Sequence, residues 1–285
     1  MKKKTVSLIL GSGGARGLAH IGVIKWLEEN NYEIKSISGC SIGALVGGFY
    51  AAGKLDIYTK WIKTLDILDM LKLMDFQGSN GLITGNKLMK KLEKLVGDCK
   101  IEELDIKFTA VASDVDGEKE VWINEGSLLN AIRASISLPL FFTPHPYKGK
   151  LLIDGGILNP VPIAPIFHDS TDTSIAVNLG SNLHQHIILK EKKKDEDISS
   201  KVKNYLINVA LPNSNINNDN IYAIANKSFD TMQSAIARMK LSAYPPDIEI
   251  KIPRNLCGIL EFDRVNELID YGYEICNYTF NEDVK

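Results

Sequence analysis

The chain has 285 residues and a mass of 31.6 kDa, and 45% of its residues are hydrophobic while 24% are charged. These values are typical of a globular protein with a buried core, and they exclude a disordered or fibrous chain. The formal net charge is −2 and the isoelectric point is about 6.2, so bulk electrostatics give no reason to expect nucleic-acid binding.

The four cysteines are widely separated and include no CxxC pair, which indicates neither a disulfide framework nor a zinc site. This cysteine usage favours a reducing compartment. Lys2–Lys4 and the apolar run that follows imitate the start of a signal peptide, but the run stops at Gly11 without a convincing cleavage site. No stretch reaches the roughly eighteen apolar residues of a membrane span. We therefore expect a soluble, cytoplasmic protein.

Apolar strands and helices alternate over the first fifty residues. A strand is predicted over 5–10, a helix over 17–30, a second strand over 34–38, and a helix over 42–52 that stops at Gly53. A glycine-rich turn joins the first strand to the first helix. This order predicts an α/β layered fold.

The middle of the chain keeps this character. Amphipathic helices are predicted over 57–74, 88–95 and 127–135, further strands over 108–112, 120–123, 151–153 and 174–178, and a last helix over 261–280. The composition changes near Lys190 and at 212–220, which indicates surface insertions around a helix. We expect a single domain over 1–285, with a C-terminal helical portion over about 195–285 packed against the rest.

The first candidate for chemistry is the glycine-rich turn from Gly11 to Gly17, between the first strand and helix. Glycines there let backbone N–H groups crowd around an anionic oxygen at the positive end of the following helix. A dinucleotide-binding GxGxxG would need glycine at position 16, where Arg16 stands. A tight turn without function is the alternative.

The second candidate is the GxSxG sequence from Gly39 to Gly43, again between a strand and a helix. A strained turn of this kind lifts the hydroxyl of its serine, Ser41, out of the sheet, and the glycines leave room for the bend. The pattern alone is weak, but its position between an apolar strand and an apolar helix is the context that such a nucleophile requires.

The third candidate is Asp154, which follows a predicted strand and precedes Gly155 and Gly156. The carboxyl ends of strands are where α/β sheets place their sites, although an Asp-Gly turn is the simpler interpretation. The three candidates together are more informative. Ser41 supplies a nucleophile, Asp154 a base and the glycine-rich turn donors for an oxyanion, and all three are expected at one edge of the sheet.

Four blocks of the sequence resemble those of the patatin-like phospholipases. These are GSGGARGLAHIGV (11–23), GCSIG (39–43), ASISLPLFFTP (134–144) and DGG (154–156), in the family's order and with its spacing. The resemblance covers about 5–179. The stretch GILEFDR (258–264) and the final helix are similar to the tail of small bacterial members, whereas 180–246 carries no recognisable block.

The resemblance implies a three-layer α/β/α sandwich with a mostly parallel central sheet, and hydrolysis of lipid acyl esters of phospholipase A or lysophospholipase type. It implies a dyad in which Ser41 is the nucleophile and Asp154 the base. The implied oxyanion hole consists of the backbone amides of Gly13, Gly14, Ala15 and Arg16. The implied partner is a lipid or lysophospholipid ester. Neither cofactor, metal nor nucleic acid is expected.

Three alternatives stay open at this point. A Ser–His–Asp esterase would need a histidine after Asp154, and His168, His184 and His186 are candidates. A non-catalytic or regulatory lipid-binding protein would keep the fold but would not need an intact site. A cofactor-binding Rossmann protein is disfavoured by Arg16 and by the lack of a clear acidic residue after the second strand.

Several other residues have both a functional and a structural interpretation. The Arg16 side chain is either a phosphate anchor or part of a salt bridge that shapes the turn. His20 is expected under the glycine-rich turn, Cys40 as filler behind Ser41, and Asp114 in a turn. The helix over 57–74 is a candidate lid. The lysine clusters 2–4 and 190–194 are candidates for transient membrane contact, although the acids around the second favour a solvated face.

Overall fold

The computed structural model describes residues 3–77, 82–181 and 221–282. Its strands are β1 (Lys4–Leu10), β2 (Tyr32–Cys40), β3 (Phe76–Gln77), β4 (Leu82–Ile83), β5 (Lys107–Asp114), β6 (Lys119–Ile123), β7 (His145–Tyr147), β8 (Lys150–Asp154), β9 (Thr173–Ser181) and β10 (Ile248–Pro253). Its α-helices are α1 (Ala19–Glu29), α2 (Ile42–Ala51), α3 (Leu55–Ile62), α4 (Ile67–Leu73), α5 (Asn86–Val96), α6 (Leu128–Ser135), α8 (Ile221–Ala243) and α9 (Val265–Glu282).

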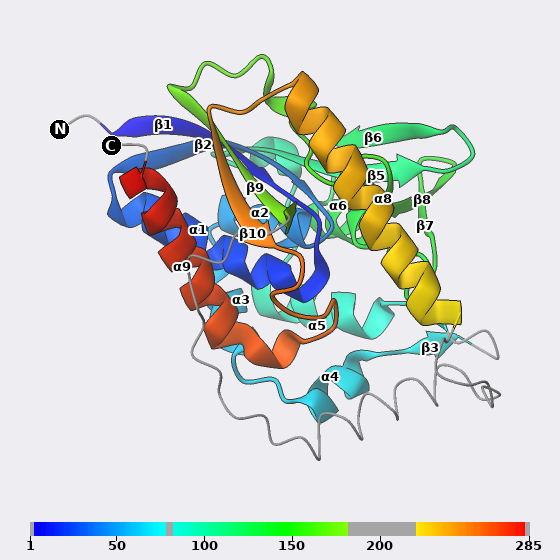
Figure 1. The fold of residues 1–285 in the computed structure, drawn as a ribbon. Coiled ribbons are helices and arrows are strands. Elements are labelled where there is room, and N and C mark those ends of the chain that lie inside the picture. The colour runs from blue at the N-terminus through cyan, green and yellow to red at the C-terminus, as the bar shows by residue number, and fades with distance from the viewer. Residues whose placement is uncertain (1–2, 78–81, 182–220, 283–285) are drawn as a thin grey trace.

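One eight-stranded sheet forms the centre of the molecule (Figure 1). Its order is β10-β9-β1-β2-β5-β8-β7, and β6 pairs with β5 as well. The five strands from β10 to β5 run parallel, whereas β6, β7 and β8 are antiparallel to their neighbours. The predicted α/β fold with a mostly parallel central sheet is confirmed.

Helices cover both faces of this sheet, because β1 is apolar on both sides. Val6, Leu8 and Leu10 belong to a large buried cluster shared with α1, α2 and α9. Ile9 points the other way into a smaller cluster that includes residues of α8. In Figure 1, α8 crosses in front of the sheet while α1 and α9 lie on its other side.

The helices α1 and α9 pack unusually closely. A Cβ atom on Gly22 would lie 1.9 Å from the carbonyl oxygen of Ile269, and one on Gly272 would lie 2.0 Å from that of Ala19. Each helix thus presents a glycine where the backbone of the other passes. The last helix is thereby fixed against the first.

The structure differs from the sequence-based expectation in several elements. The helix predicted over 57–74 is divided into α3 and α4, because Asp66 accepts a hydrogen bond from the Asp69 N–H at 2.8 Å and starts a new helix. The predicted helix over 17–30 begins instead as a 3₁₀ turn over Gly14–Leu18. The sequence patterns did not predict strands β3, β4, β7 and β10. The insertions near Lys190 and at 212–220 lie outside the described residues.

No helix within 3–77, 82–181 or 221–282 is both long and apolar enough to traverse a bilayer.

Candidate active site

Ser41 stands in the sharp turn between β2 and α2. Its φ is 55° and its ψ is −128°. A non-glycine residue at positive φ is strained, and such residues cluster at functional sites. A Cβ on Gly39 would lie 2.5 Å from the carbonyl oxygen of Gly43, and one on Gly43 would lie 2.1 Å from that of Leu10. Both glycines of the GxSxG sequence are therefore required by close backbone approach.

Ser135, the last residue of α6, holds this turn from the side. Its hydroxyl accepts a hydrogen bond from the Ser41 N–H at 2.9 Å and donates one to the carbonyl oxygen of Val111 at 2.6 Å. The residue is completely buried. The strained backbone of Ser41 is thus anchored to β5 through a single hydroxyl.

Asp154 reaches the turn because two strands meet end to end along β5. Strand β2 pairs with β5 up to Cys40, which lies opposite Val111, and the antiparallel β8 ends with Asp154 opposite Ala112. Strand β6 occupies the other side of the same residues of β5. Asp154 therefore approaches Ser41 from a strand that runs antiparallel to β5 and meets β2 end to end.

The Asp154 carboxyl group is fully buried and held by backbone. Its Oδ1 accepts a hydrogen bond from the Gly156 N–H at 2.7 Å, and its own N–H donates to the carbonyl oxygen of Ser137 at 3.0 Å. Burial raises the pKa of Asp154 to about 7, while hydrogen bonding from the Ser41 hydroxyl and from Gly156 opposes that rise. A base with this pKa is well matched to neutral pH.

The second carboxyl oxygen, Oδ2, is buried and has no hydrogen-bond partner of good geometry within the described ranges. The Ser41 hydroxyl is nevertheless close enough for its hydrogen bonding to lower the Asp154 pKa. Such a loose contact is common in a free active site and tightens when substrate binds. Oδ2 is therefore the free acceptor of the pair.

The glycine-rich turn leads from β1 into the 3₁₀ turn beside Ser41. Gly14 has φ of 57°, and the Ala15 N–H donates to the carbonyl oxygen of Ile259 at 2.8 Å. The N–H groups of Gly13 and Gly14 have no acceptor in the described part of the chain. Two amides of the turn are thus free to bind an oxygen, whereas that of Ala15 is engaged.

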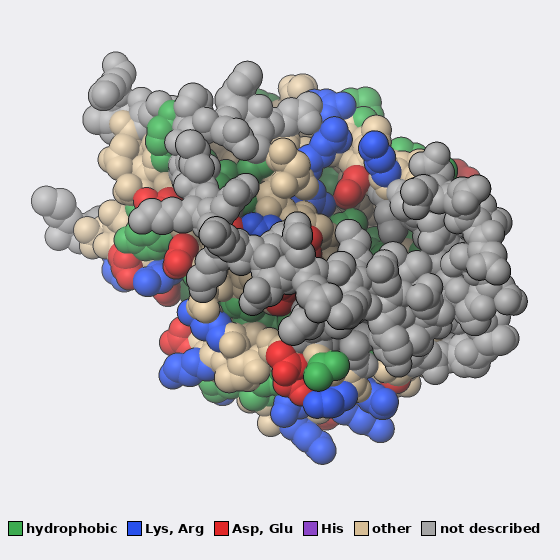
Figure 2. All heavy atoms as spheres, turned by 60° about the horizontal axis from the view of Figure 1, so that its bottom comes forward, with side chains coloured by type: hydrophobic (Ala, Val, Ile, Leu, Met, Phe, Trp, Pro, Cys, Tyr) green, Lys and Arg blue, Asp and Glu red, His purple; other side chains and the backbone are tan. Residues whose placement is uncertain are grey.

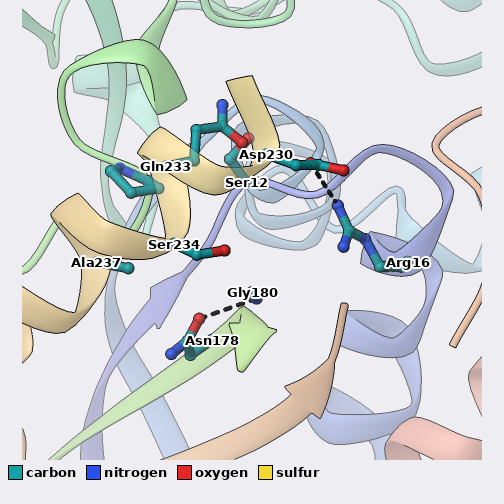
Figure 3. Close-up of a pocket in the computed structure, with 9 residues that line it drawn as sticks. Ser12, Arg16, Asn178, Gly180, Asp230, Gln233, Ser234 and Ala237 are labelled. Atoms are coloured by element: carbon teal, nitrogen blue, oxygen red, sulfur yellow. Dashed lines mark hydrogen bonds and ion pairs between the residues drawn. The ribbon is translucent and has the colours of Figure 1, made fainter. Parts of the chain in front are cut away.

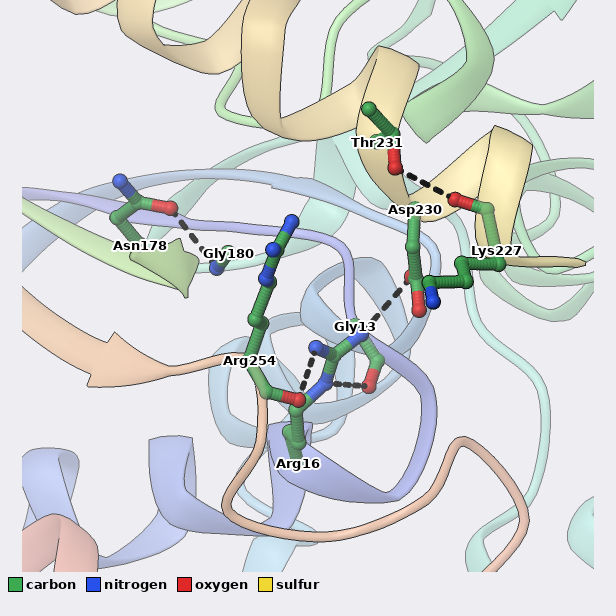
Figure 4. A network of polar contacts seen from close by, with 8 residues as sticks. All are labelled: Gly13, Arg16, Asn178, Gly180, Lys227, Asp230, Thr231 and Arg254. Carbon is green, nitrogen blue, oxygen red and sulfur yellow. Dashed lines mark hydrogen bonds and ion pairs between the residues drawn. The ribbon is translucent and has the colours of Figure 1, made fainter. Parts of the chain in front are cut away.

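Arg16 fastens this turn to two distant parts of the fold, as Figure 4 shows. Its Nε donates to the carbonyl oxygen of Gly13 at 3.0 Å and one terminal nitrogen to that of Arg254 at 2.8 Å. The other terminal nitrogen forms an ion pair with Asp230 of α8 at 3.2 Å. The side chain is 4% exposed, so its geometry supports the salt-bridge interpretation over a phosphate anchor.

A small polar cavity lies between this turn and α8 (Figure 3). Ser12, Arg16 and Asn178 line it from the side of the sheet, and Asp230 and Ser234 from α8. Sequence reasoning did not connect α8 with the site, because 180–246 has no recognisable block.

The remaining motif glycines also stand at close approaches. A Cβ atom on Gly17 would lie 2.2 Å from the side chain of Ile42, and one on Gly155 would lie 2.0 Å from the carbonyl oxygen of Val111. Corresponding distances are 2.8 Å to the Val177 carbonyl oxygen for Gly11 and 2.5 Å to the Ser12 hydroxyl for Gly156. The glycines thus bring the three predicted segments together.

His20 lies under the glycine-rich turn, as expected. Its Nε2 donates to the carbonyl oxygen of Gly11 at 2.9 Å, and burial lowers its pKa to about 4, so it is neutral. Burial, with the Arg133 charge, also lowers the pKa of His145 to about 4, while His168 is exposed. No described histidine is hydrogen bonded to Ser41 or Asp154. His184 and His186 lie outside the described residues.

Cys40 and Asp114 have structural roles. The buried Cys40 thiol donates to the carbonyl oxygen of Pro160 at 3.3 Å, and burial raises its pKa well above the usual range. Asp114 accepts from the Gly117 N–H at 3.0 Å and forms an ion pair with Lys150 at 2.7 Å, as suits a turn. Within the described chain, no group of three or more His, Cys, Asp or Glu side chains is arranged to hold a metal ion.

The chain is similar in sequence to several known proteins. The sequence profile described as patatin-like phospholipase matches residues 8–167. An uncharacterized NTE family protein of Mycobacterium tuberculosis is 36% identical over 319 residues, covering 94% of this chain and 89% of the relative. Lysophospholipase NTE1 of Pyricularia oryzae is 27% identical over 282 residues, which are 95% of this chain but 18% of that protein.

Among solved structures, VipD from Legionella pneumophila is similar in fold, with a TM-score of 0.55 at 16% sequence identity. The match covers 98% of this chain and 67% of the VipD chain.

Proposed function

The chain belongs to the patatin-like phospholipase family, and from that membership we propose a serine hydrolase that cleaves lipid acyl esters through the Ser41–Asp154 dyad. The observation that supports this most is the pairing of a strained, nearly buried serine with a buried carboxyl group whose pKa is about 7. A structural aspartate gains nothing from burial without a counterion, whereas a general base does.

In the proposed acylation step, Ser41 Oγ bonds to the ester carbonyl carbon while its proton passes to Oδ2 of Asp154. The carbonyl oxygen becomes an oxyanion, and the free N–H groups of Gly13 and Gly14 donate to it. Each such donor is worth roughly 3 kcal/mol of transition-state stabilisation. The N-terminus of α2, which begins at Ile42, adds a favourable dipole.

Collapse of this intermediate breaks the bond between the carbonyl carbon and the alcohol oxygen, and the alcohol leaves with the proton from Asp154. The acyl group remains on Ser41. Water then attacks the acyl carbon, gives a proton to Asp154, and releases the fatty acid as the proton returns to Ser41 Oγ. The proposed oxyanion hole omits Ala15, because its N–H is already bound to Ile259.

We propose phospholipids and lysophospholipids as the substrate class. The relative from Pyricularia oryzae is named as a lysophospholipase and aligns with 95% of this chain. Single-chain lysophospholipids are the substrates to test first.

The test is labelling with a fluorophosphonate, followed by peptide mass spectrometry and by release of fatty acid from lysophosphatidylcholine. We expect stoichiometric labelling at Ser41, abolished in Ser41→Ala and slowed in Asp154→Asn. The matched control is Ser228→Ala, which removes an exposed hydroxyl bonded to its own helix. Folded protein that neither labels nor releases fatty acid would indicate the non-catalytic lipid-binding alternative.

A Ser–His–Asp esterase predicts a different outcome. His168→Ala, His184→Ala and His186→Ala are each expected to leave the labelling rate unchanged. Loss of labelling in one of them, with Ser41→Ala also inactive, would replace the dyad by a triad.

A further inference from the structure

Four lysines on α5 form a single stripe along the outer face of the helix. Lys87, Lys90, Lys91 and Lys94 follow the spacing i, i+3, i+4, i+7, so they project from one side. All four are exposed, and none makes an ion pair with a described residue. Leu92 of the same helix is completely buried, and Leu88 and Leu95 beside it are partly buried. We call the four residues the lysine stripe.

Like charges at this spacing repel one another and weaken the helix that carries them. The stripe is about 10 Å long at 1.5 Å per residue, close to the Debye length of about 8 Å at physiological salt, so its four charges act together on an approaching surface. Acids nearby do not neutralise it. Glu93 makes no ion pair with the stripe, and the Asp75 carboxylate is bound to Thr84 and to the backbone N–H groups of Gly85 and Lys87.

The neighbouring helix α3 also has exposed apolar and basic groups. It packs against α5 and exposes Ile57, at 41%, and Lys60 one turn later. In Figure 2, where the lower side of Figure 1 comes forward, Lys and Arg side chains lie along the lower edge, with Asp and Glu side chains among them. Apolar groups beside unpaired lysines fit a lipid surface better than a fully polar polyanion.

The stripe is also connected to the candidate site. Arg133 of α6 donates to the carbonyl oxygen of Thr84, just before α5, at 2.6 Å and to the Ser137 hydroxyl at 2.5 Å. Ser137 in turn accepts from the Asp154 N–H at 3.0 Å. Arg133 and Ser137 thus link the start of α5 to the proposed base through hydrogen bonds.

From these observations we propose that the lysine stripe docks the protein onto an anionic lipid bilayer, which presents the ester to Ser41. This proposal rests on the proposed function for its substrate. Its test does not, because vesicle binding is measured with the Ser41→Ala variant, which needs no catalysis.

The test variant replaces Lys87, Lys90, Lys91 and Lys94 with Gln, which has similar helix propensity. The matched control replaces Lys25, Lys35, Lys148 and Lys251 with Gln. These four lysines already have acidic partners and lie on other elements, and the change in net charge is the same. Co-sedimentation uses vesicles of phosphatidylcholine with and without phosphatidylglycerol, at two salt concentrations.

We expect binding to phosphatidylglycerol vesicles that weakens with salt, falls at least tenfold in the stripe variant and is retained in the control. Hydrolysis of a soluble short-chain ester should be unchanged in the stripe variant made with Ser41 intact. Equal binding by the two variants would overturn the proposal, and so would equal binding to pure phosphatidylcholine. Tighter binding of a single-stranded oligonucleotide than of vesicles would assign the stripe to another polyanion.

Discussion

The backbone of Ser41 is tied to the hydroxyl of Ser135, a residue 94 positions later in the chain. The same hydroxyl donates a hydrogen bond to the carbonyl oxygen of Val111 on β5. With one donor and one acceptor partner, its orientation is fixed. Ser41 is held at positive φ by this bond and by the close approach of Gly39 and Gly43. The strained backbone of the proposed nucleophile is therefore stabilised by residues outside the proposed dyad.

Ser135→Ala should lower kcat roughly ten- to a hundredfold with little change in KM. The substitution removes the acceptor of the Ser41 N–H and lets the reacting oxygen shift, and small misplacements cost about this much. Steady-state kinetics on a soluble ester measures it. A variant with wild-type kcat would show that Ser135 does not position Ser41.

The rate should depend on pH through Asp154. Because a base must be deprotonated to accept the Ser41 proton, kcat/KM should rise with pH and level off above about 7, the Asp154 pKa. The profile is measured between pH 5 and 9 on a soluble ester, with circular dichroism confirming the fold at each pH. An inflection near the ordinary aspartate pKa would contradict this assignment.

Asp154→Asn should stabilise the protein at pH 8 while removing its activity. The folded pKa of about 7 lies above the ordinary 3.8, so the native state binds more protons and loses stability as pH rises between these values. The loss for a shift of this size is on the order of 4 kcal/mol. Urea unfolding of both proteins at pH 5 and pH 8 should show a variant advantage that is larger at pH 8.

Arg16→Lys should slow fluorophosphonate labelling and destabilise the fold by about 2 kcal/mol. An ammonium group cannot reproduce the three directions in which the guanidinium meets Gly13, Arg254 and Asp230. Asp230→Asn keeps a hydrogen-bond acceptor and should give a smaller effect on both measurements. Labelling at the wild-type rate in Arg16→Lys would mean that the turn holds its shape without this side chain.

Gly22→Ala should destabilise the protein by roughly 2–3 kcal/mol, because the added methyl group would lie 1.9 Å from the carbonyl oxygen of Ile269 on α9. Lys25→Ala, on the exposed side of the same helix, is the control and should stay within about 0.5 kcal/mol. Chemical unfolding of both variants distinguishes a steric cost from a general effect on α1.

The sequence predicts well where the signal is local. Apolar strands followed by a glycine, as at Leu10-Gly11 and Ser38-Gly39, identify the turns that carry Gly13 and Ser41. The bounds of β1 and α2 agree with expectation to within one residue. The pattern of β10 was available too, since Ile248, Ile250 and Ile252 alternate with Glu249 and Lys251. This strand carries no motif, and it was not predicted.

The sequence does not reveal contacts between segments far apart in the chain. Asp154 lies at the end of a strand, as predicted, but the antiparallel pairing of β8 with residues 112–114 of β5, beyond the end of β2, has no local signal in the sequence. The bond between Ile259 and the Ala15 N–H, which removes one predicted oxyanion donor, joins residues 244 positions apart. Tertiary packing determines such partners, and local sequence patterns do not predict them.

The contacts of Arg16 also have a consequence for biosynthesis. The dyad is encoded by the first 154 residues, yet the turn that is proposed to bind the oxyanion is secured by Asp230, Arg254 and Ile259. During translation, these partners leave the ribosome some eighty to a hundred residues after Asp154. A nascent chain therefore holds the side chains of the proposed dyad before its glycine-rich turn is secured, and we expect the proposed oxyanion hole to form only after Ile259 has emerged.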